Sequence, residues 1–180
     1  ILQLVQAGRL GLDDTIGKYL PDYPNKAVAN SVTVRQLLSH TSGLGDFFGD
    51  DFEQYSASLK TLDDYVRHFA KDAPQFTPGN QDSYSNYGFI VLGRIIEVVS
   101  GQSYYAYVEQ HILRPAGMMG TGFEPETVNV PQRAVAYTKE DPLERADDCD
   151  HGLSAGYEDA VRSGLRTRYP RLAHFGLVRG

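Results

Sequence analysis

Residues 87–100 read YGFIVLGRIIEVVS and carry the strongest helical pattern in the chain. The apolar residues that share one helical face are Phe89, Leu92, Ile96 and Val99. Further isoleucines and valines fill the sides of the same helix. Because a helix that is apolar nearly all round is normally buried, we predict a central helix from Tyr87 to Ser100. Gly101 is expected to end it.

Shorter helices are predicted on both sides of this central element. Thr33 is expected to cap one of them, and Thr61 and Asp64 form a weak capping box before another. Ser103 is expected to cap the next helix after Gly101. The predicted segments are residues 1–8, 15–19, 34–38, 62–69 and 104–113, with Asp13 or Asp14 capping the second. We predict loops around Pro21, Pro24 and Asn25 and over residues 47–55, and a short strand over residues 135–138.

Length and composition exclude several classes of protein. The 180 residues suggest one domain or a piece of one. A net charge of −6 argues against a general nucleic-acid binder, which needs a basic face for phosphates. The single cysteine, Cys149, forms no internal disulfide and no cysteine-based zinc site. No wholly apolar run approaches the ~20 residues that a membrane span needs.

Both ends of the chain differ from the middle. Residues 1–8 begin inside an apolar helical pattern without an N-cap residue, so we expect this helix to be truncated. Residues 141–150 are acidic and polar, whereas residues 162–180 carry arginines and no acidic residue. We therefore divide the chain into residues 1–140, one part of a domain, and an atypical tail over residues 141–180.

Tyr84-Ser85-Asn86 lies between the Pro78-Gly79 turn and the central helix, where side chains can project into a cleft. A phenol is a poor base at its ordinary pKa of ~10, but a nearby cation favours the phenolate or lets it relay a proton. The amide of Asn86 can orient a substrate carbonyl or a lysine. Composition alone favours the interpretation of Tyr84 as a packing residue, because the chain holds 12 tyrosines.

Several short motifs, which follow one another along the chain, favour the catalytic interpretation of Tyr84 over the packing interpretation. They are LLSHTSGL at residues 37–44, FTPG at 76–79, YSNYG at 84–88, LGRIIE at 92–97 and RPAGM at 114–118, together with the opening residues 1–14 and Tyr-Leu-Pro at 19–21. This series closely resembles the serine β-lactamase-related family, in its class C-like branch with D-alanyl-D-alanine carboxypeptidases and esterases. The resemblance runs from Ile1 to about Thr138.

The resemblance implies an α+β fold, the β-lactamase and penicillin-binding-protein-like fold, of which this chain covers mainly the helical part. It also implies that Tyr84 and Asn86 are catalytic, Tyr84 sharing proton transfers and Asn86 holding substrate and lysine. The family nucleophile is the serine of Ser-x-x-Lys, where one helical turn places the ammonium beside the hydroxyl. No serine in this chain has a lysine three residues later. The family layout places that motif just before Ile1.

Other residues with chemical potential receive structural interpretations. His40 has no partner ligand three or four residues away, so we interpret it as a structural histidine. Ser42 is interpreted as a turn residue, and Glu97 as a packing or salt-bridge residue. His174-Phe175-Gly176 has the letters of the family's third motif, but it lies too close to Tyr84 in sequence and lacks a strand pattern.

These observations predict part of a serine hydrolase that acts through an acyl-enzyme on a β-lactam, a peptidyl-D-alanine or a small ester. No metal or organic cofactor is implied, and the family suggests a periplasmic or extracellular location. One alternative is a non-catalytic penicillin-binding-like sensor or binding protein on the same fold, and another is a helical domain without a site. The chain alone is expected to be inactive. We also expect the tail over residues 141–180 to be out of frame or disordered, because codons for residues 159–168 can be chosen so that a one-base shift reads a helix typical of the family.

Overall fold

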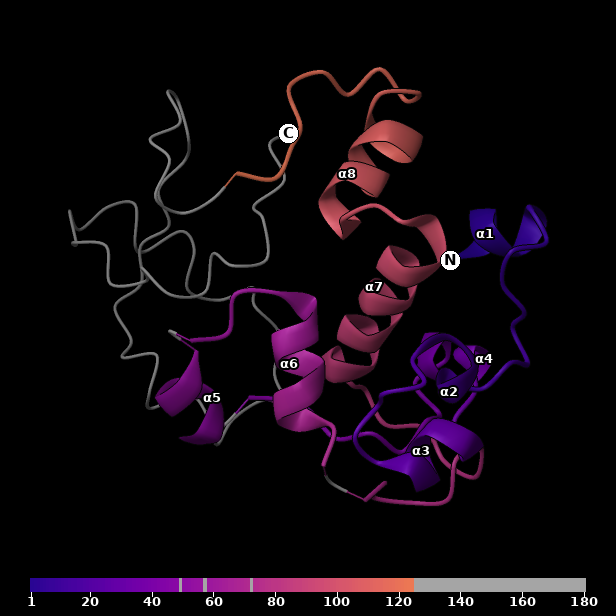
Figure 1. Cartoon of the computed structure of the whole chain (residues 1–180), viewed down its shortest axis with the longest axis vertical. Helices are drawn as coiled ribbons and strands as arrows, with labels where there is room; N and C mark the ends of the chain where they lie inside the picture. The colour runs from indigo at the N-terminus through magenta and orange to yellow at the C-terminus, as the bar shows by residue number, and fades with distance from the viewer. Residues whose placement is uncertain (49, 57, 72, 125–180) are drawn as a thin grey trace, which may run out of the picture. The chain divides into compact units, whose positions relative to one another are not determined.

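The computed structural model describes residues 1–48, 50–56, 58–71 and 73–124 (Figure 1). The chain divides into two compact units, Ile1–Gly117 and Met118–Gly180. The helices are α1 (Leu2–Gln6), α2 (Ile16–Tyr19), α3 (Lys26–Ser31), α4 (Val34–Leu38), α5 (Asp50–Tyr55), α6 (Leu62–Phe69), α7 (Asn86–Ser100), α8 (Tyr104–Val108) and the π-helix η1 (Glu109–Leu113). The described residues contain no strand beyond an isolated antiparallel bridge between Thr15 and Thr33.

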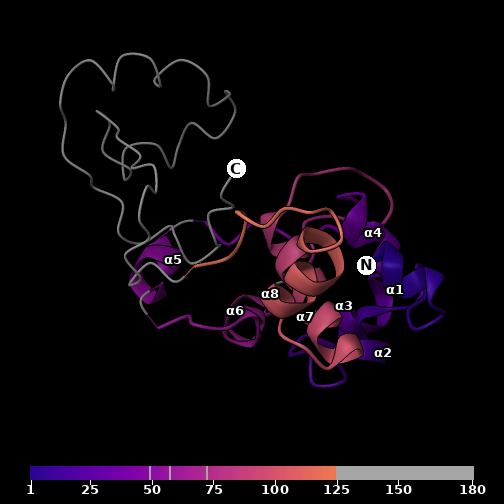
Figure 2. The same ribbon diagram turned by 90° about the horizontal axis from the view of Figure 1, so that it is seen from above.

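Helix α7 is the centre of the first unit, as predicted. Figures 1 and 2 show it between α6 on one side and the group α2, α3 and α4 on the other. Eight of its residues are buried, and Val91 and Ile95 are fully enclosed. Phe89 and Val98 are exceptions, because 48% and 45% of their surfaces stay exposed. Gly101 ends the helix in the left-handed conformation, at φ +74°, where glycine has no steric penalty.

Three of the helix N-caps that the sequence predicts are formed. Thr33 and Gln36 make a capping box at α4, and Thr61 and Asp64 make a second one at α6. Ser103 accepts a hydrogen bond from the backbone N–H of Ala106 at the start of α8. These side chains satisfy backbone donors that the first helical turn leaves unpaired, which fixes where each helix begins.

Two local expectations are wrong, and one helix was not predicted. The N-cap of α2 is Thr15, because the Asp14 carboxylate instead accepts hydrogen bonds from Lys18, Tyr19 and the backbone N–H of Gly11. Helix α5 replaces part of the loop predicted over residues 47–55. The helix that was not predicted is α3, which begins directly after the loop around Pro21 and Pro24 and has Asn25 as its side-chain cap.

An aromatic cluster accounts for α5. The Phe47 ring lies 5.3 Å from Phe52 and 5.7 Å from Tyr65, measured between centroids. Phe69 of α6 joins the same cluster at 5.9 Å from Phe47. Burial of aromatic rings contributes more to stability than the helix propensity of a six-residue segment, so tertiary contacts order this helix.

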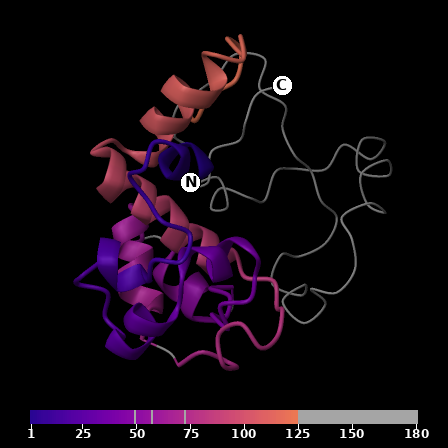
Figure 3. The same cartoon turned by 90° about the vertical axis from the view of Figure 1, so that its right-hand side faces the viewer.

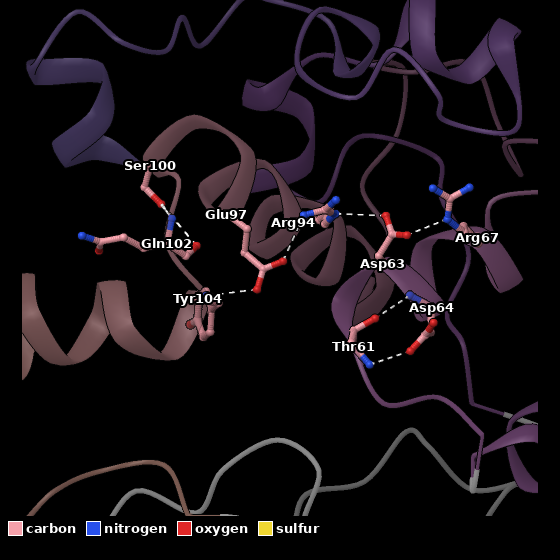
Figure 4. Close-up of polar contacts among 9 residues, drawn as sticks. All are labelled: Thr61, Asp63, Asp64, Arg67, Arg94, Glu97, Ser100, Gln102 and Tyr104. Carbon is pink, nitrogen blue, oxygen red and sulfur yellow. Dashed lines mark hydrogen bonds and ion pairs between the residues drawn. The ribbon is translucent and has the colours of Figure 1, made fainter.

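A polar network ties α6, α7 and the start of α8 together (Figure 4). Asp63 pairs with Arg67 at 2.6 Å and with Arg94 of α7 at 3.1 Å. The hydrogen bond from Arg67, followed by that from Arg94, lowers the pKa of Asp63 below its ordinary value. Glu97 pairs with Arg94 at 3.3 Å and accepts a hydrogen bond from the backbone N–H of Tyr104 at 3.1 Å. The interpretation of Glu97 as a salt-bridge residue is therefore confirmed.

The predicted helix over residues 104–113 is present but changes geometry within its length. Its first half is α-helical and its second half is the π-helix η1. Figures 1 and 3 show α8 beyond the C-terminal end of α7, at the opposite end from α2, α3 and α4. The predicted strand over 135–138, the tail over 141–180 and the His174 motif lie outside the described residues. Across the described part, every helix is too short or too polar to cross a membrane.

Candidate active site

The turn over residues 40–46 and the segment before α7 are held together by hydrogen bonds. The backbone N–H of Ser83 donates to the carbonyl of His40 at 2.9 Å, and that of Ser85 donates to Nδ1 of His40 at 3.2 Å. The hydroxyl of Ser85 donates to the carbonyl of Gly45 at 2.8 Å. Two segments about 40 residues apart thus form one rigid junction at the N-terminus of α7.

Ser85 is the N-cap of α7 and belongs to the scaffold. Its side chain is 1% exposed, and its Oγ also accepts a hydrogen bond from the backbone N–H of Gly88 at 3.0 Å. This cap fixes the first turn of α7. The residues on either side of the cap, Tyr84 and Asn86, therefore have fixed starting points for their side chains.

Tyr84 lies at the surface of this junction. Its side chain is 70% exposed, and its ring packs against the imidazole of His40 with 4.5 Å between centroids. Its hydroxyl donates to Oδ1 of Asn86 at 3.4 Å, which is a long hydrogen bond. The structure thus brings the two predicted site residues together. Their catalytic roles stay predictions.

Asn86 makes its strongest contact with a residue that sequence reasoning missed. Its Nδ2 donates to Oδ2 of Asp46 at 2.8 Å, and its backbone N–H approaches the same oxygen at 3.4 Å. The other oxygen of Asp46 accepts from the backbone N–H of Phe47 at 2.8 Å. No spacing in the sequence marks Asp46, because its partner is 40 residues away.

The remaining site candidates have structural roles in the described part of the chain. Ser42 is 1% exposed, and its Oγ accepts a hydrogen bond from the backbone N–H of Leu44 at 3.2 Å, as a turn residue does. His40 adopts φ +58° and uses Nδ1 as an acceptor, in agreement with the structural interpretation. Among the described residues no group of three or more His, Cys, Asp or Glu side chains is placed to hold a metal ion.

Two cavities in the described part lie away from Tyr84. One of about 350 Å³ lies between α1 and the α7–η1 region, and one of about 250 Å³ lies between the loop after α2 and helices α6 and α7. Neither is lined by Tyr84 or Asn86. Tyr84 itself lies at the surface, whereas Asn86 is half-buried. A phenol and an amide can relay a proton and orient a polar group there, but neither is an activated nucleophile.

Solved structures share this fold. A penicillin-binding protein from Bacillus halodurans has a TM-score of 0.65 and 34% identity, over 76% of this chain and 43% of that one. A D-stereospecific amidohydrolase from Streptomyces sp. has a TM-score of 0.65 and 32% identity, over 76% and 44%. EstCE1, described as a hydrolase with promiscuous acyltransferase activity, has a TM-score of 0.63 and 29% identity, over 74% and 38%. The fold is therefore that of the β-lactamases and penicillin-binding proteins.

The family follows from the sequence as a whole. The family model described as Beta-lactamase matches residues 1–173, and this chain belongs to that family. The resemblance stated from the sequence motifs is confirmed. The chain spans about a third of the length of the curated relatives it matches, 33% and 28% for the first two.

Proposed function

We propose that the complete protein carrying this chain is a serine hydrolase that acts through an acyl-enzyme. The observation that carries the proposal is the Tyr84–Asn86 pair at the N-terminus of α7, in a chain of the Beta-lactamase family. The hydroxyl oxygen of Tyr84 lies 3.4 Å from Oδ1 of Asn86. An α+β fold, with a sheet contributed by the rest of the protein, belongs to the same proposal. We also propose that the chain divides after residue 140, into part of a β-lactamase-related domain and the atypical tail, and that the protein is periplasmic or extracellular.

In the proposed reaction a serine oxygen attacks the substrate carbonyl carbon, and the serine proton passes to the lysine–tyrosine pair. The C–N or C–O bond then breaks, and the leaving group takes up that proton. Water hydrolyses the resulting acyl-serine ester in a second step. Tyr84 would relay the proton and Asn86 would hold the lysine and the substrate, while the serine and the lysine lie outside these 180 residues.

The exposure of Tyr84 supports this division of the site. In the described part its ring contacts His40 and its hydroxyl donates to Oδ1 of Asn86, and neither partner is a lysine cation. A Ser-x-x-Lys helix packed over this face would supply that cation together with the nucleophile. On this proposal the 180-residue chain alone has half of a site and no acyl-transfer activity.

The substrate class we propose is a β-lactam, a peptidyl-D-alanine or a small ester. The similar penicillin-binding protein and D-stereospecific amidohydrolase support a β-lactam or a peptidyl-D-alanine as substrate. EstCE1, a hydrolase with acyltransferase activity, supports acyl transfer in general. The second candidate is a non-catalytic sensor or binding protein. It would keep Tyr84 and Asn86 but lack the Ser-x-x-Lys nucleophile in the complete protein.

Covalent labelling separates these candidates. The gene product with its upstream coding sequence is incubated with a fluorescent penicillin and, separately, with a serine-directed fluorophosphonate, and the labelled peptide is identified by mass spectrometry. We expect one serine, in a Ser-x-x-Lys sequence outside residues 1–180, to be labelled stoichiometrically. Reversible binding of the penicillin without an acyl adduct would support the sensor, and labelling of a serine within residues 1–180 would contradict the proposed site.

A further inference from the structure

Asp46 joins the candidate site to the loop that supports it. Its carboxylate lies between two groups of donors, the backbone N–H of Phe47 on one oxygen and the Asn86 amide on the other. Asn86 is the first residue of α7, whose 15 residues give its N-terminus a positive partial charge. A carboxylate at this place is therefore stabilised by the helix as well as by its hydrogen bonds.

The chemistry of the pair fixes which way the amide of Asn86 faces. An ionised carboxylate only accepts hydrogen bonds, so the atom of Asn86 at 2.8 Å from Asp46 has to be Nδ2. The carbonyl Oδ1 then faces the other way, where it accepts the hydroxyl of Tyr84. If the amide were reversed, two acceptors would meet at Asp46 and the Tyr84 hydroxyl would face an N–H donor.

The surroundings give Asn86 little freedom to compensate. The neighbouring Ser85 is locked by its hydrogen bond to the Gly45 carbonyl, so the backbone of the 45–46 turn cannot shift away from α7 without breaking that bond. Asn86 itself is half-buried. The orientation of its amide thus depends on one charged partner.

We propose that Asp46 is a positioning residue, which holds the Asn86 amide with its carbonyl oxygen toward Tyr84 and thereby presents a hydrogen-bond acceptor to a cationic partner of the tyrosine. This inference rests on the proposed function for its catalytic consequence. The carbonyl oxygen can accept from an ammonium group, and one Nδ2 hydrogen stays available for a substrate carbonyl. Asp46 touches neither.

The test compares Asp46→Ala and Asp46→Asn with the control Asp82→Asn, in the gene product with its upstream coding sequence. Asp82 is also an exposed acid, two residues before Tyr84 in the sequence, so its replacement matches the change in charge. We expect kcat to fall about 10- to 100-fold in Asp46→Ala with little change in KM. A misplaced Asn86 amide slows the chemical step but leaves substrate binding nearly unchanged. Asp46→Asn should lose less, because its side-chain oxygen still accepts from Nδ2, and Asp82→Asn should match the wild type. An unchanged kcat in Asp46→Ala would overturn the inference.

A second readout is independent of catalysis. The side-chain amide resonances of Asn86 are assigned by their loss in an Asn86→Ala variant. In Asp46→Ala we expect the separation between the two Nδ2 proton shifts to shrink, because the bonded proton loses its partner, whereas unchanged resonances would overturn the inference. If the wild type shows neither turnover nor labelling, the proposed function fails and this spectrum alone decides the role of Asp46. If Asp46→Ala does not fold, Asp46→Leu is measured in its place, because leucine removes the acceptor while keeping a side chain of similar length.

Discussion

The backbone N–H of Ser85 donates a hydrogen bond to Nδ1 of His40 at 3.2 Å, although the two residues lie 45 positions apart. The His40 ring also contacts the rings of Tyr84 and Phe89, at 4.5 and 5.1 Å between centroids. Its backbone adopts φ +58°, a conformation that residues other than glycine seldom use. One side chain therefore connects the turn after α4 to the N-terminus of α7.

Replacement of His40 should loosen this junction. His40→Ala leaves the N–H of Ser85 without its acceptor and removes both ring contacts, so we expect the free energy of unfolding to fall by about 1–3 kcal/mol. Urea titration followed by circular dichroism measures the change. The control is His111→Ala on the exposed surface of η1, for which we expect a smaller loss. Among the described residues the ring of His111 contacts that of Tyr107 alone, at 4.4 Å between centroids, so a loss in His40→Ala no larger than that in His111→Ala would contradict the connecting role of His40.

Gly43 should tolerate no side chain. It adopts φ +74°, and a Cβ built there would lie 2.5 Å from the carbonyl oxygen of Phe76. Gly8 is a matched control, because it adopts φ +67° with nothing within 4 Å of its Cβ position. We expect Gly8→Ala to cost about 1–2 kcal/mol from the backbone alone, and Gly43→Ala to cost about 1–3 kcal/mol more from the clash. Thermal unfolding of the two variants gives this difference, and a value near zero would refute the close approach.

The Asp63 network should make stability depend on acid pH. The pKa of Asp63 is lowered in the folded state, chiefly by Arg67, so its carboxylate contributes stability above its ordinary pKa of ~4. That contribution is lost as the pH falls through the folded-state pKa. Because the group is about one-third exposed, we expect Asp63→Asn to cost only about 1 kcal/mol at pH 7 and to leave stability nearly unchanged near pH 2. An equal cost at both pH values would contradict the role of these ion pairs.

Tyr23 should produce the opposite dependence at alkaline pH. Burial raises its pKa to about 12, while its hydroxyl lies 3.1 Å from that of Tyr87. The unfolded chain releases the Tyr23 proton near pH 10 and the folded chain near pH 12. The contribution of neutral Tyr23 to the free energy of unfolding is therefore complete below pH 10 and is lost as the pH rises from about 10 to about 12. We expect Tyr23→Phe to flatten this fall, which urea titrations at pH 9 and pH 11 would measure. Parallel losses in wild type and variant would show that other tyrosines cause it.

The parts of the fold that the sequence predicts are those set by local pattern. The central helix follows from its continuous apolar face, and Thr33 and Thr61 mark helix starts because a cap and its partner lie three residues apart. Helix α5 was missed because its order depends on the ring of Phe47 and on rings of α6, which lie outside its own six residues.

The candidate site divides in the same way. Tyr84 and Asn86 could be singled out because a short motif carries them next to a strong helix. Asp46 could not, because its contact with Asn86 exists only after the turn following α4 has folded against α7. The cap at Ser85 was missed although its signal is local, since its hydroxyl accepts from the backbone N–H of Gly88 three residues later. Only its donation to the carbonyl of Gly45, 40 residues earlier, depends on the tertiary fold.

The most direct test of the account is the turnover number of Tyr84→Phe in the gene product with its upstream coding sequence, assayed with a chromogenic β-lactam and a nitrophenyl ester. The change removes one exposed hydroxyl, so folding should be unaffected, and Tyr55→Phe on α5 serves as the matched control. We predict that kcat falls about 10²- to 10⁴-fold in Tyr84→Phe, the usual contribution of a general acid–base group, and stays at the wild-type value in Tyr55→Phe. Wild-type turnover in Tyr84→Phe would contradict the account and reduce Tyr84 to a packing partner of His40.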